Sequence, residues 1–100
     1  MKIINLTPHI LRLNDGTEYA PSGTVARVST SYTPFIDGVA SVTFGELQGL
    51  PAPQEGALFV ASALVCQAAK RADVVSPATG HPDCKRENGQ VVSVPGFIRA

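Results

Sequence analysis

The sequence predicts an α+β domain, predominantly antiparallel β-sheet with one short helix over about residues 62–71. The first observation behind this is a series of short, β-rich runs separated by turn residues, and the second is that only one run has a helix-forming composition. The third is the length of 100 residues, which fits a single domain over residues 1–100. Apolar residues make up 44% of the chain, which is close to the globular average and enough for a core.

The first half of the chain is predicted as a succession of strands. They are expected over residues 2–6, 9–13, 17–20, 24–29 and 39–44. Thr7-Pro8 should end the first strand because proline lacks a backbone N–H, and Asn14-Asp15-Gly16 should form a hairpin turn. Residues 31–38 are expected as a loop with the turn pair Asp37-Gly38. Residues 45–56 contain three glycines and two prolines, which predicts a long ordered loop.

The second half is predicted to hold the helix. Residues 57–61 form a buried strand, and the Ser62 hydroxyl then caps a helix over residues 63–71 by accepting from a first-turn amide. Lys70 and Arg71 are expected in the last turn, where cations suit the helix dipole. Further along, the expected elements are a strand at 73–75, a loop at 76–83, a hairpin pairing 84–86 with 90–94, and residues 97–98 docked on the core.

Charge and composition limit the classes of function. Eight basic and eight acidic side chains give a net charge of zero, which argues against non-specific nucleic-acid binding. Cys66 and Cys84 are too few for a disulfide scaffold. The longest apolar stretch, residues 57–66, is interrupted by Ser62 and is shorter than the roughly 20 residues that span a bilayer. The N-terminus becomes polar too early for a signal peptide, so a cytoplasmic protein without membrane contact is expected.

Arg27 is the centre of the predicted site. It lies among apolar residues of its strand, and a guanidinium buried there without a partner would be costly. Because arginine matches phosphate geometry, we expect Arg27 to contribute to an anion-binding surface. Glu46 and Gln54 would lie nearby and His9 would supply a hydrogen bond. One alternative is a structural ion pair between Arg27 and a glutamate, Glu46 or Glu55. The other is that the aliphatic stem of Arg27 covers a sheet face while its guanidinium stays in water.

Two other motifs favour structural interpretations. His81, Asp83 and Cys84 are zinc-ligand types, but completing four ligands would need His9 or Cys66, and Cys66 is expected to be buried. This segment is therefore interpreted as a polar loop, and no metal or cofactor is predicted. Ser62 between a strand and a helix is similar to a nucleophile elbow, yet that elbow needs glycines on both sides of the serine. Here its neighbours are Ala61 and Ala63, the residues two positions away are Val60 and Leu64, and no triad is visible. Ser62 is therefore interpreted as a helix cap.

Several segments together resemble a family of small bacteriophage and prophage proteins. They are Ile4-Asn5-Leu6-Thr7-Pro8-His9 and residues 21–28, 44–46, 49–51, 53–56, 62–65 and 73–77, so the resemblance covers nearly the whole chain. It implies a phage or prophage origin and supplies no catalytic residues. The resembling segments also contain polar residues that a bare fold would not require. These are Asn5, Thr7, His9, Arg27, Glu46, Gln54 and Glu55.

Three functions from different classes remain open. The first is a non-enzymatic phage protein that captures a small anionic ligand or nucleotide and thereby blunts a host defence signal. The second is a phage structural or protein-interaction module that acts through an oligomer interface or a sheet edge. The third is a small hydrolase using Ser62, His9 or His81, or a metal. No catalytic motif is present, so the sequence favours a non-enzyme, and the small size with many strand edges predicts a homo-oligomer in the cytoplasm of a bacterial host.

Overall fold

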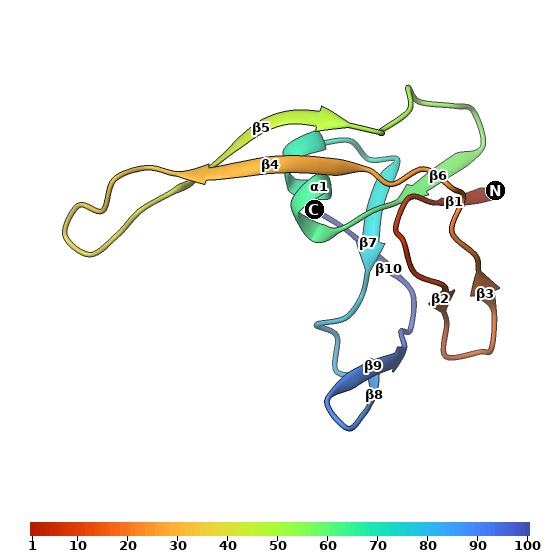
Figure 1. The fold of residues 1–100 in the computed structure, drawn as a ribbon. Helices are drawn as coiled ribbons and strands as arrows, with labels where there is room; N and C mark the ends of the chain where they lie inside the picture. Colours follow the sequence, from red (N-terminus) through yellow and green to blue (C-terminus); the bar gives the residue numbers. More distant parts are fainter.

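The computed structural model describes residues 1–100 and is β-rich with one short helix, as predicted (Figure 1). The helix α1 covers Ala63–Ala69 and is too short to span a membrane. The strands are β1 (Lys2–Asn5), β2 (Leu11–Arg12), β3 (Glu18–Tyr19), β4 (Arg27–Tyr32), β5 (Val42–Gln48), β6 (Ala57–Val60), β7 (Val74–Pro77), β8 (Lys85–Glu87), β9 (Gln90–Ser93) and β10 (Phe97–Arg99).

The main sheet has four strands in the order β1-β6-β7-β10. β6 pairs in parallel with both β1 and β7, and only β10 joins antiparallel. The predicted predominance of antiparallel pairing is therefore wrong for this sheet, although it holds for the hairpins β2–β3, β4–β5 and β8–β9. Parallel neighbours need a crossover of about a dozen residues or more, and α1 lies in the one between β6 and β7. Turn residues indicate hairpins but not crossovers.

The core lies on both faces of this sheet. On one face, Phe59 and Val74 pack with Leu6, Ala26 and the helix residues Val65 and Cys66. On the other face, Val60 and Val75 pack with Leu11. Strands covered on both faces are apolar at consecutive positions, which is why residues 57–60 have no polar alternation.

The helix begins as predicted and ends earlier. The Ser62 hydroxyl accepts a hydrogen bond from the Val65 amide at 3.3 Å, which confirms the N-cap. Lys70 adopts a left-handed conformation with φ of 52° and turns the chain away after Ala69. The expectation that Lys70 and Arg71 lie in the last turn is therefore wrong. Arg71 instead reaches Asp73 and the carbonyl of Pro51.

The β4–β5 hairpin, residues 27–48, is longer than predicted and is called the arm below. β4 begins three residues later than expected and continues to Tyr32, while β5 runs through Gly45 to Gln48. Between the pairs Val28–Leu47 and Thr30–Phe44 the register shifts, so the partner strand has one extra residue. This β-bulge lets the strand continue where the glycine predicted a loop, and only residues 49–56 remain loop.

The arm makes the protein elongated. Figure 1 shows it extending from the main sheet and α1, with the turn between β4 and β5 at its far end. The radius of gyration is 14.9 Å, compared with about 13 Å for a compact chain of 100 residues. The principal extents of 46, 36 and 21 Å agree with this shape.

Candidate functional site

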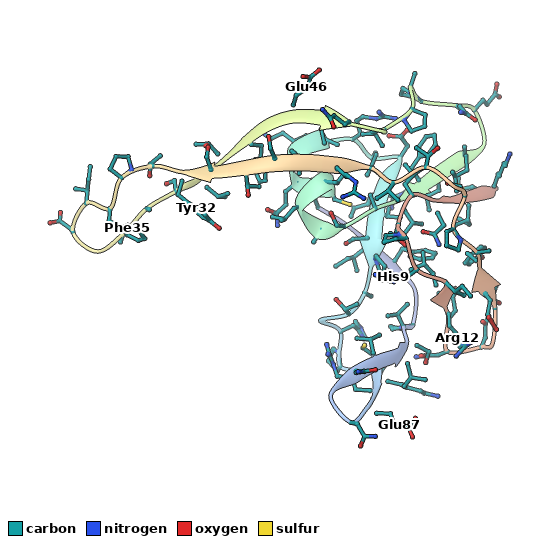
Figure 2. The ribbon with its side chains drawn as sticks, in the orientation of Figure 1. His9, Arg12, Tyr32, Phe35, Glu46 and Glu87 are labelled. Carbon is teal, nitrogen blue, oxygen red and sulfur yellow. The ribbon has the colours of Figure 1, made fainter.

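The far end of the arm exposes large apolar side chains. Phe35, Ile36 and Val39, called the apolar tip below, are 76%, 71% and 68% exposed. Tyr32 and Val42 at the ends of the two strands are also exposed. Figure 2 shows Tyr32 and Phe35 on the arm, far from the labelled residues of the main body. The chain itself therefore supplies nothing to cover the apolar tip.

The backbone of the tip is a well-formed hairpin turn. Ile36 and Val39 exchange two backbone hydrogen bonds of 2.9 and 3.0 Å. Between them, Asp37 and Gly38 have φ of 53° and 79°, the positive values of a type I′ turn, as their turn-forming pair suggests. The hydroxyl pair Ser31–Thr43, at 2.6 Å, also links the strands. The apolar tip is thus presented on an ordered backbone.

Arg27 begins β4 and lies at the other end of the arm. It lines a hollow of about 710 Å³, called the Arg27 hollow, together with Glu46, Gln48 and Ser62. The ion pairs in the structure are Arg12–Glu18, Arg71–Asp73 and His81–Asp83, and Arg27 belongs to none of them. Arg27 is exposed, so its charged head is not buried in the core.

The four residues predicted to form one site do not all meet. Arg27 and Glu46 line the same hollow. His9 lines a different hollow, and Figure 2 shows it on the opposite side of the arm from Glu46. Gln54 lies in the loop before β6, where its backbone carbonyl accepts from the Ala57 amide at 3.1 Å. The structure therefore groups Arg27 with Glu46 in one hollow and places His9 in the adjoining one, which shares Thr7, Pro8 and Ser62 with it, while Gln54 lines neither.

The second hollow, called the His9 hollow, has a volume of about 510 Å³. Its walls come from residues 7–12, the start of α1, the end of β7 and the β9 segment. Ile10, Val91 and Val92 contribute exposed apolar side chains to it, whereas its basic side chains are His9 and Arg12. No carboxylate lines it. This hollow combines an apolar wall with a basic edge.

Asn5 and Thr7 hold the wall of the His9 hollow in place. The Asn5 side-chain amide donates to the carbonyls of His9 at 2.7 Å and Tyr19 at 3.1 Å. Its oxygen accepts from the Thr7 amide at 2.9 Å and the Thr7 hydroxyl at 2.7 Å. Both residues are buried. The expectation that the fold does not require Asn5 and Thr7 is therefore wrong, because their side chains satisfy the buried Thr7 amide and the partly buried carbonyls of His9 and Tyr19.

Other titratable groups have structural partners. The Arg71 guanidinium donates to both carboxylate oxygens of Asp73, at 2.9 and 2.6 Å, which holds the pKa of Asp73 below its ordinary value. Burial raises the pKa of the Cys66 thiol, so this thiol stays protonated near neutral pH. In the loop that contains His81, Asp83 and Cys84, His81 Nδ1 accepts from the Asp83 amide at 3.0 Å. No group of three potential metal ligands occurs in the chain.

Comparisons with protein-family models, with curated proteins and with solved structures find no match to this chain. The residues of the arm and of the two hollows are therefore what indicates the function. Sequence reasoning missed the apolar tip because Phe35 and Ile36 next to a turn could equally have folded back onto the core. The signal that could have identified it is the absence of charged residues other than Asp37 between residues 28 and 45.

Proposed function

We propose that the protein is a non-enzymatic interaction or structural module of a phage or prophage, and that it self-associates through the arm. The observation that carries this proposal is the apolar tip at the end of a two-stranded ribbon. Large apolar side chains exposed together in this way are typical of protein contacts. Two-stranded ribbons are also only marginally stable in water without packing, and the arm packs against the core at its base, through Val28 and Leu47. A protein partner on the arm would satisfy both features.

The edges of the arm support the same function. Natural proteins protect exposed strand edges with charged residues, prolines or coverage by another element. In the arm, β4 and β5 pair only with each other. From residue 28 to residue 45, Asp37 is the only charged residue, and it lies at the turn. The strand edges are therefore open to association along most of their length.

The first prediction is that self-association depends on the apolar tip. Light scattering of the 10.5 kDa chain at high micromolar concentration should give a mass of a dimer or larger. The double variant Phe35→Ser, Ile36→Ser should be a folded monomer, because both side chains are exposed and removing them changes stability by only about 0.5 kcal/mol. Ile98→Ser, which also removes an exposed apolar side chain, should still associate. A monomeric wild-type protein would contradict the proposal.

Arg27 favours a second candidate function, the capture of a small anionic ligand or nucleotide. Arg27 has no ion-pair partner and lines a hollow with the polar residues Ser29, Gln48 and Ser62. Arginine with neutral donors nearby can bind a phosphate or carboxylate group. The carboxylate of Glu46 in the same hollow would repel an anion, so anion capture ranks below self-association as the proposed function.

The second prediction tests this candidate by thermal shift with nucleotides and inorganic phosphate. A ligand at about 100 times its dissociation constant stabilises the folded state by about 3 kcal/mol, which for this chain length raises Tm by about 10 °C or more. Arg27→Gln should abolish that rise while leaving the ligand-free Tm nearly unchanged, because the residue is exposed. Gln54→Ala, outside the hollow, is the control. Equal shifts in wild type and Arg27→Gln would exclude Arg27 as the binding residue.

A further inference from the structure

We propose that the receptor for the apolar tip is the His9 hollow of a second copy of this chain. The inference rests on the proposed function, self-association through the arm, and adds the surface that the arm contacts. The chain would then carry both halves of the interface, an apolar projection and an apolar recess.

The His9 hollow is where the exposed apolar surface of the body gathers. Outside the arm, the exposed large apolar residues are Met1, Ile10, Leu64, Val91, Val92 and Ile98. Ile10, Val91 and Val92 all line the His9 hollow, whereas only Leu64 lines the Arg27 hollow. The third hollow, at the end of α1, is lined mainly by basic and polar residues around Arg71 and Arg99. Of the three recesses, the His9 hollow fits apolar side chains best.

The apolar tip and the His9 hollow also carry side chains of complementary charge. Asp37 lies at the turn, between Ile36 and Val39, and is the only charged residue of the tip. The His9 hollow presents Arg12 and His9 and no carboxylate. Arg12 contacts Glu18 at 3.4 Å, a long and exposed pair. Its guanidinium has donors to spare, so Arg12 can meet Asp37 of an incoming arm without losing Glu18.

The arm cannot fill the hollow of its own chain. Figure 2 shows Phe35 at the far end of the arm and His9 near the middle of the body. The two backbone hydrogen bonds between Ile36 and Val39 also fix the tip before binding, which reduces the entropy lost on association. If two copies exchange arms about a two-fold axis, the result is a closed dimer, and otherwise the copies join head to tail.

The test is a complementation experiment with two variants that each destroy one half of the interface. The arm variant is Phe35→Ser, Ile36→Ser, and the hollow variant is Ile10→Glu, which places a carboxylate where Asp37 would arrive. Ile10 is 59% exposed, so the glutamate remains solvated in the free chain. Ile98→Glu is the matched control, since Ile98 is 49% exposed and lines neither hollow. Masses are measured by light scattering for each variant alone and for equimolar mixtures.

Each variant alone should be monomeric, and the mixture should form a one-to-one complex. The intact arm of the hollow variant can enter the intact hollow of the arm variant, so the mixture should associate roughly tenfold or more tightly than either variant alone. Asp37→Asn, which keeps a residue tolerant of positive φ, should weaken wild-type association by about two- to fivefold. Ile98→Glu should associate like the wild type.

Two results would overturn the inference and separate it from the proposed function. If the wild type associates and the arm variant does not, but Ile10→Glu associates normally or the mixture stays monomeric, the receptor is not the His9 hollow, although the arm still mediates association. If the wild type is monomeric, both proposals fail.

Discussion

Replacing Asn5 by alanine should lower the free energy of unfolding by about 3 kcal/mol or more. The Asn5 side chain is 2% exposed and bonds to Thr7, His9 and Tyr19. Alanine would leave the buried Thr7 amide without its acceptor and would remove the amide donor from the partly buried carbonyls of His9 and Tyr19, of which the His9 carbonyl keeps the Thr7 hydroxyl at 3.2 Å. Each buried polar group without a partner costs about 1–3 kcal/mol. Urea or thermal unfolding monitored by circular dichroism measures the loss.

Asn5→Asp changes the hydrogen bonds of the side chain while keeping its volume nearly constant. Aspartate keeps the acceptor for Thr7, but as a carboxylate it places a second oxygen against the carbonyls of His9 and Tyr19. We therefore expect a loss as large as that of Asn5→Ala. Gln54→Ala, an exposed amide with no side-chain hydrogen bond, should change stability by less than about 0.5 kcal/mol. Losses below about 1 kcal/mol in both Asn5 variants would contradict the network.

Among alanine substitutions at the glycines with positive φ, Gly49→Ala should lower the free energy of unfolding the most. Gly49 follows β5 with φ of 76°, a conformation that costs other residues about 1–2 kcal/mol. A Cβ atom there would also collide with the carbonyl oxygen of Val25 and lie 3.1 Å from its carbon. Both are backbone atoms that cannot rotate away. We expect a total loss of about 3 kcal/mol in the free energy of unfolding, with the base of the arm loosened.

Gly56→Ala is the matched control for the collision. Gly56 has nearly the same φ, 73°, but an added Cβ would meet no atom within 4 Å. Its variant should therefore lose only the conformational part, about 1–2 kcal/mol. The difference between the two variants measures the collision with Val25. Equal losses would show that Val25 does not approach Gly49 as closely as described.

Local interactions in the chain could be predicted from the sequence. The Ser62 cap and the helix after it depend on neighbouring residues, so composition was enough to place the helix start. The turns at Asn14-Asp15-Gly16 and Asp37-Gly38 can be predicted because few residues tolerate positive φ, and the expected hairpin of residues 84–94 turns at Asn88 and Gly89 for the same reason. The continuous apolar run at residues 57–60 correctly indicated a buried strand. The β-rich character with one short helix follows from these features.

The tertiary structure decided the features that depend on distant partners. Residues 6–56 separate β1 from its parallel neighbour β6, and nothing in either strand specifies that pairing. Asn5 is structural because folding brings Tyr19 to it, and His9 and Arg27 line adjoining hollows rather than one common site. The exposure of Phe35 depends on the arm leaving the body. Burial and pairing are set by what lies opposite a residue in space, and that is a property of the whole fold.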